Sequence, residues 1–391
     1  MSRRIIGLII FTLILLPQVC IAGEASNLPA IQPEDTLHQI DLNQVEKNVD
    51  LLNREIGQAI PNLNFKDLVI SLAKGEMGYH PRDFVNALLK YLFQEVVANA
   101  HLLGKLVVLA VICAVLNNVA TAFEKASAAK LAQMAVYLVL ITVALGSFTV
   151  ALQAGREAVD NMVDFMHAML PVLLVLLCAV GGIASAGLFH PVILTVLNAS
   201  GLIVKNIVFP LVFFSAILGM ASHFASGFSI SRLGDLLRNV GLGIMGVCST
   251  AFLGLLTIQG VAGAVTEGVT FRTAKFATQT FLPIVGKLFS DSMEAVIGSS
   301  LLVKNAVGLA GLLIIFLMAL FPLIKIMALV IIYKLASALV QPVGETNLSN
   351  CLNSLGNSMV AVFAVVATTG LLFFFALAII SGMGNLTVML R

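Results

Sequence analysis

The hydrophobic positions of this chain follow two patterns that change at about residue 100. Before that point, apolar residues recur every three to five positions among charged ones, as at Leu37, Val45, Val49, Leu52 and Ile56. This spacing predicts an amphipathic helix that begins after Pro33 and ends at Pro61. Beyond residue 100, apolar runs of about 20 residues dominate, and such runs are long enough to cross a bilayer. The pattern therefore predicts an all-α chain with a small amphipathic part and a polytopic helical membrane part.

Two more short helices are expected before residue 100. One runs from Asn64, a suitable N-cap, to Gly75, a suitable C-terminal stop. The other begins at Pro81, since proline is favoured in a first helical turn. Because this part is small, we expect it to rest on the membrane domain, on the bilayer or on a partner.

The apolar runs beyond residue 100 predict six to eight membrane spans. Clear spans fall at residues 101–122, 131–152, 169–188, 240–265 and 359–383. Two runs, 191–225 and 306–340, are too long for one span and short for two, and prolines 210 and 322 interrupt them. Each run is either a tight helical hairpin or one long helix kinked where proline removes a backbone donor.

Composition supports a membrane protein and excludes other classes. Hydrophobic residues make up 59% of the 391 residues, charged residues only 11%, and the mean hydropathy is +1.02. A formal net charge of +2 argues against binding to nucleic acid. Residues 23–100 hold six basic and eleven acidic residues, whereas residues 101–391 hold fourteen and nine, so the amino-terminal part is distinctly acidic.

The first 22 residues resemble a secretory signal peptide. Arg3 and Arg4 precede an apolar stretch over residues 5–16 and small residues near Ala22. An uncleaved first membrane anchor is the alternative. We therefore expect a signal peptide at 1–22, an exported helical segment at 23–100 and a multipass transmembrane domain at 101–391. Loop charges agree, since residues 124–130 are basic and expected inside, while 156–167 are acidic and expected outside.

Charged residues within apolar sequence are the candidate functional positions. Lys287 and Asp291 are an i, i+4 pair, and Glu294 continues their face. Intramembrane charges usually face a bundle interior or a water-filled cavity, so the candidate pathway-lining residues are Lys205, Lys287, Asp291, Glu294 and Lys304. For Lys205 and Lys304, placement at helix ends with the ammonium at the interface is equally consistent.

The apolar face of the first amphipathic helix is the candidate partner-docking surface. It consists of Leu37, Val45, Val49, Leu52 and Ile56. The alternative is that this segment covers the protein's own spans, with no partner involved.

No sequence pattern points to an enzyme, a cofactor or a metal site. The usual nucleotide, dinucleotide and zinc-protease motifs are absent from the sequence. Ser185 and Ser200 stand among small residues, with His223 downstream, but small residues are the ordinary material of packed membrane helices. We therefore expect no catalytic, cofactor-binding or metal-binding residues.

The order of these features resembles the stage III sporulation protein AE family of endospore-forming bacteria. The resemblance rests on the leader, the acidic segment with Gly75-Glu76 and His80-Pro81, residues 282–291, residues 304–308, and a polar stretch before one last span. It implies a permease-like or channel-associated subunit in the mother-cell membrane around the forespore. It also implies that the protein acts with other stage III A proteins and the forespore protein Q.

Two alternatives to that implied function stay open. One is a non-conducting scaffold that docks the other subunits, and the other is an autonomous secondary transporter of a small solute. In each case the lipid bilayer is a partner, nucleic acid is not, and assembly into a homo-oligomer is left open.

Overall fold

The structure is a computed structural model that describes residues 42–56, 64–75, 81–122, 127–222, 230–281, 285–343 and 346–383. No β-strand occurs among these residues, so the all-α class expected from the sequence is confirmed. The expected signal peptide lies outside the described residues.

Two short helices precede the long ones. Helix α3 spans Asn43–Ile56 and helix α4 spans Phe65–Lys74. The Asn64 side chain accepts a hydrogen bond from the Lys66 amide at 3.0 Å, and Gly75 ends α4 with a φ of 75°, so both expected caps are confirmed. A left-handed φ of this kind favours glycine because it lacks a Cβ.

Helices α5 and α6 form a bent pair. Helix α5 spans Pro81–Ala98 and begins at the expected proline, and α6 spans Ala100–Ala122. The two helices meet at Asn99 with a bend of 41°. The Asn99 side chain donates to the Glu95 carbonyl at 2.9 Å, which satisfies a backbone acceptor close to the bend.

Helix α7 corrects the expected separation of two spans. It runs without interruption over Ser127–Ala179, a length of 53 residues, so residues 131–152 and 156–167 and the first part of 169–188 share one helix. Residues 156–167 therefore do not form a loop, and their acidic charge does not support the expected orientation. The helix accommodates these polar residues because several lie on one face and form hydrogen bonds or ion pairs with neighbouring helices.

The two ambiguous runs are continuous helices, not hairpins. Helix α8 spans Ile183–Ile203, the π-helical turn η1 spans Val204–Val208, and α9 spans Phe209–Ala221. In the π turn the Phe209 amide donates to the Val204 carbonyl. Pro210 follows directly and has no amide hydrogen to donate, which accounts for the local change of hydrogen bonding.

Three more long helices complete the described chain. Helix α10 spans Ser231–Phe281, α11 spans Val285–Val340 with Pro322 inside it, and α12 spans Thr346–Gly382. A short 3-10 turn, Gln341–Val343, follows α11. The polar residues ahead of the expected last span are thus the first turns of α12.

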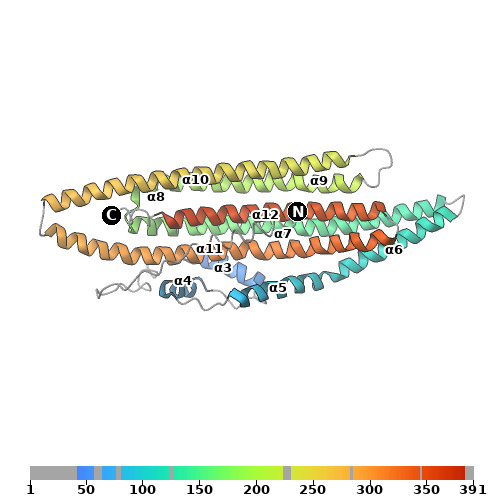
Figure 1. The fold of residues 1–391 in the computed structure, drawn as a ribbon, viewed down its shortest axis with the longest axis horizontal. Coiled ribbons are helices and arrows are strands. Elements are labelled where there is room, and N and C mark those ends of the chain that lie inside the picture. Colours follow the sequence, from blue (N-terminus) through green and yellow to red (C-terminus); the bar gives the residue numbers. More distant parts are fainter. Residues whose placement is uncertain are drawn as a thin grey trace. The chain divides into compact units, whose positions relative to one another are not determined.

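Helices α7, α11 and α12 pack against one another and form most of the buried core, and α10 packs along α9 (Figure 1). Ser337 and Ser349 exchange hydroxyl-to-carbonyl hydrogen bonds of 2.9 Å between α11 and α12. The buried Tyr333 hydroxyl donates to the Ala144 carbonyl of α7 at 3.2 Å. Because water is scarce in such a core, these polar contacts keep the helices in register.

Five described helices are long and apolar enough to cross a membrane, or six if the bent α5–α6 pair counts as a span. Five is below the expected six to eight and six is at its lower limit, chiefly because two expected spans merge in α7. At 1.5 Å per residue, α7 is about 80 Å long, whereas a hydrocarbon core is about 30 Å thick. Only part of each long helix therefore fits within one bilayer.

Candidate functional site

Five polar residues form a stripe along the middle of α7. They are spaced by four, three, four and three positions, which places them on one helix face: Gln153, Glu157, Asp160, Asp164 and His167. We call this set the α7 stripe. Glu157 and Asp164 are exposed, while Asp160 and His167 are half-buried. Apolar turns of α7 precede and follow the stripe.

Lys205 of η1 joins the α7 stripe through an ion pair. Its ammonium donates to both carboxylate oxygens of Asp160, at 2.9 and 2.8 Å. Both side chains stay substantially exposed, at 46% for Lys205 and 44% for Asp160. The pair thus lies on the surface of the chain and not in its core.

The π turn explains why Lys205 lies in this position. A π-helical turn inserts extra backbone into a helix and changes the direction of the side chains within it, and such turns are frequent at functional sites. Val204 and Val208 of the same turn are buried, whereas Lys205, Asn206 and Ile207 are exposed. The turn therefore presents Lys205 and Asn206 at the surface, and it brings Lys205 to Asp160 of α7.

Two more hydrogen bonds organise the stripe. The Gln153 amide donates to Glu157 Oε1 at 2.9 Å, and His167 Nε2 lies 2.9 Å from Asn198 Oδ1 on α8. Three carboxylates, the ammonium of Lys205 and the guanidinium of the adjacent Arg156 give this surface a formal net charge of −1. The surface therefore attracts cations and disfavours anions.

A tight packing contact holds the opposite face of α7 in the core. A Cβ added at Gly155 would lie 3.1 Å from side-chain atoms of Val362 and Val366 on α12, and 3.3 Å from the Phe209 ring on α9. The three helices approach closely here, so a larger residue at this position would require these side chains to shift by a few tenths of an ångström. Next to it, Arg156 places its guanidinium carbon 6.0 Å from the Phe209 ring centre, a cation–π arrangement.

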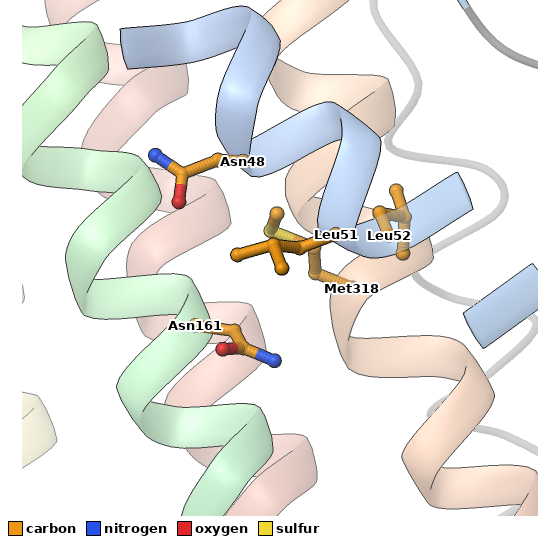
Figure 2. Close-up of a pocket in the computed structure, with 5 residues that line it drawn as sticks. All are labelled: Asn48, Leu51, Leu52, Asn161 and Met318. Carbon is orange, nitrogen blue, oxygen red and sulfur yellow. The ribbon is translucent and has the colours of Figure 1, made fainter. Parts of the chain in front are cut away.

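A third side of α7 faces the amino-terminal helix α3. Asn161 lines a cavity of about 10 Å³, which is room for about one water, together with Asn48, Leu51, Leu52 and Met318. Figure 2 shows Asn161 extending from α7 into the gap that α3 and α11 share with it. At the height of the stripe, α7 thus carries polar side chains on two of its sides.

The other expected pathway residues are placed differently. Lys304 is completely buried, and its ammonium donates to the Ser381 carbonyl at 2.6 Å, next to the end of α12. A cation there also interacts favourably with the carbonyl end of the helix. Lys287, Asp291 and Glu294 belong to the first turns of α11, and their side chains lie outside the described part of the structure. A pathway role for these four residues stays a prediction.

The expected docking face is largely covered by the chain itself. Val45, Val49 and Leu52 are buried where α3 packs on α7 and α11. This arrangement corresponds to the alternative in which the segment covers the protein's own helices. Leu37 and the Ile56 side chain lie outside the described residues, and partner docking stays a prediction.

The sequence marks Lys205 as a candidate pathway residue, which stays a prediction, but it does not indicate the ion pair with Asp160. A signal for the α7 stripe itself was present in its four-three-four-three spacing, which is typical of a helix face and not of a loop. Among the residues that the structure describes, no three His, Cys, Asp or Glu side chains gather as metal ligands.

Comparison with known proteins identifies the family of this chain. The family model for stage III sporulation protein AE matches residues 63–384. The chain belongs to this family. Stage III sporulation protein AE of Bacillus subtilis (strain 168) is 40% identical over 358 residues, which cover 92% of this chain and 90% of that protein. No solved structure matches the chain.

Membership in the stage III sporulation protein AE family confirms the resemblance drawn from the sequence. Together with the long apolar helices, it makes the chain a membrane protein of stage III of sporulation. The region matched by the family model contains α4 to α12, and therefore the whole α7 stripe and Lys205.

Proposed function

We propose that this chain is a permease-like, channel-associated subunit of the complex that connects mother cell and forespore during sporulation. In this proposal the α7 stripe and Lys205 line a water-filled path through the membrane. The other stage III A proteins and the forespore protein Q are its partners, and the mother-cell membrane around the forespore is its location. The chain catalyses no reaction and needs no cofactor.

The exposed Asp160–Lys205 pair is the observation that carries this proposal. It lies midway along α7, with apolar helix on both sides. In this proposal that level of α7 lies within the bilayer, where a charged side chain exposed to lipid costs about 2.5–3.5 kcal/mol. Contact with water removes most of it, so a charged surface at this position favours an aqueous environment.

The acidic charge of the stripe adds a prediction about selectivity. A negative net charge on one wall raises the local concentration of cations. A path lined by this surface therefore prefers cations and neutral solutes to anions of similar size.

Neutralisation of the stripe tests the proposal. The variant combines Glu157→Gln, Asp160→Asn and Asp164→Asn, which keep side-chain size and remove three charges. We expect spore formation to fall at least tenfold in a strain that carries this variant as its only copy, at equal amounts of protein in the membrane.

The matched control neutralises exposed carboxylates on the short amino-terminal helices, through Asp50→Asn and Asp67→Asn. We expect this control to form spores normally. Normal spore formation with the neutralised stripe would instead contradict a pathway role and favour the non-conducting scaffold.

A further inference from the structure

A second polar surface lies between α9, α10 and α12, close to the ends of these helices. It is a cleft of about 240 Å³ whose lining residues are all polar or glycine: Ser215, Gly219, Ser231, Gly234, Asp235, Arg238, Asn350, Asn353, Ser354, Asn357 and Ser358. Gly219 and Gly234 bring the helices together, since a Cβ on Gly219 would lie 2.7 Å from Ser354 Oγ. The cleft is separate from the α7 stripe, with which it shares no residue.

Lys334 of α11 orients two of the asparagines that line the cleft. Its ammonium donates to Asn353 Oδ1 and to Asn357 Oδ1, both at 2.6 Å. Because an ammonium only donates, the amide atom that contacts Lys334 in each asparagine is the oxygen, which accepts the bond. The amide NH₂ groups of Asn353 and Asn357 then remain as donors for a ligand.

Arg238 contributes further donors from the α10 wall. One of its terminal nitrogens donates to Asp235 Oδ1 at 2.6 Å. A guanidinium carries five N–H donors and no acceptor, so most of its donors are not used by this bond. Asp235 is the single carboxylate in the cleft, and with Arg238 and Lys334 it gives a net charge of +1.

We infer that this cleft binds the phosphate group of a small molecule or of a phospholipid headgroup. Arg238 on one wall and Asn353 and Asn357 on the other offer N–H donors to the cleft, and its formal net charge is positive, so an anionic ligand rich in acceptor oxygens is favoured. A phosphate offers oxygens in several directions, as donors on two walls require, whereas the two oxygens of a carboxylate lie in one plane. A cleft of about 240 Å³ is large enough for a phosphate with a short substituent.

The surroundings are compatible with both sources of phosphate. Leu233 and Leu236 on α10 are about half exposed beside the cleft, as expected where acyl chains contact a protein. The lining is polar throughout, which suits a soluble phosphate ester equally well. The chemistry of recognition is the same in both cases, and the experiment separates them.

The test measures phosphate binding by the purified full-length protein. In detergent, native mass spectrometry and thermal stability are followed as glycerol 3-phosphate or inorganic phosphate is added. In parallel, the protein is reconstituted in nanodiscs of phosphatidylglycerol or of phosphatidylcholine and retained lipid is counted. We expect Arg238→Gln and Lys334→Met to weaken binding at least tenfold. The control Arg232→Gln changes an exposed arginine of the same helix that does not line the cleft, and we expect it to bind normally.

A variant with the opposite expected sign separates binding from misfolding. Asp235→Asn removes the one carboxylate, so we expect it to bind phosphate more tightly, which an unfolded protein does not do. Binding of glycerol 3-phosphate identifies a soluble source, and retention of phosphatidylglycerol without it identifies a lipid headgroup. Absence of both, equal loss in Arg232→Gln, or weaker binding in Asp235→Asn would overturn the inference.

Discussion

At the scale of single residues, the function proposed for this chain depends on how Asp160 and Lys205 pair. The ion pair joins two residues that are 45 positions apart in the sequence, and both side chains stay exposed. The sequence marks Lys205 as a polar interruption of an apolar run, but no local pattern names its partner. The same holds for Lys304 and Ser381, which are 77 positions apart. Such partners are set by packing and not by spacing along the chain.

Reversal of the charges tests the pair directly. Asp160→Lys places two cations together, and Lys205→Asp places two carboxylates together, so each variant alone replaces attraction with repulsion. The double variant restores an opposite-charge pair on the same two helices. We expect each single variant to form at least tenfold fewer spores, and the double variant to recover most of the loss.

Spore counts and the amount of protein in the membrane are measured for all three variants. A double variant no better than either single one would show that the charges act separately. Because exposed pairs in water contribute about 0.2–1 kcal/mol, the pair is expected to affect function more than folding.

At the scale of elements, short helices could be predicted from the sequence, but the continuity of the long ones could not. Asn64 and Gly75 end α4 through bonds within a few residues, so the local sequence suffices. The middle of α7 was expected to be a loop because mean hydropathy ignores which face a polar residue occupies. Whether Pro210 and Pro322 end a helix or only modify it depends on neighbouring helices, which the sequence does not show.

Close approach between helices gives a prediction at this scale. A Cβ on Gly370 of α12 would lie 2.6 Å from the Ala319 Cβ on α11, a distance that forces the helices apart. We expect Gly370→Ala to lower the free energy of unfolding by roughly 1–3 kcal/mol, the usual cost of overpacking. The measurement is unfolding by sodium dodecyl sulfate in mixed micelles, followed by circular dichroism.

The matched control for this prediction is Gly246→Ala in α10. Apart from the helix's own nearby backbone, no atom lies within 4 Å of the Cβ that it adds, so the main effect is better helix propensity. We expect it to leave stability unchanged or to raise it by up to about 1 kcal/mol. The reverse order of the two variants would contradict the α11–α12 packing.

At the scale of the whole molecule, the central question is whether water reaches the middle of α7. The long helices are longer than a bilayer is thick. The α7 stripe lies between apolar turns of the kind that contact lipid. The sequence predicted the helical membrane class and the need for polar residues within it. It did not predict that the α7 stripe forms one continuous helix face. The hydropathy profile divides α7 into separate spans with a connection between them, and the stripe lies in that expected connection.

Cysteine accessibility along this face tests the central claim most directly. Single cysteines replace Val150, Glu157, Asp164 and Val175, all exposed and all on the same face of α7, in a chain without its five native cysteines. Val247 and Ile258 of α10, each 72% exposed, are the controls for a surface in contact with lipid. A membrane-impermeant thiol reagent is applied to intact sporulating cells and to inverted membranes. We expect all four α7 positions to react and the two α10 positions to stay unmodified. No modification at any of the four positions, or modification at 157 and 164 alone, would contradict a water-filled path along α7.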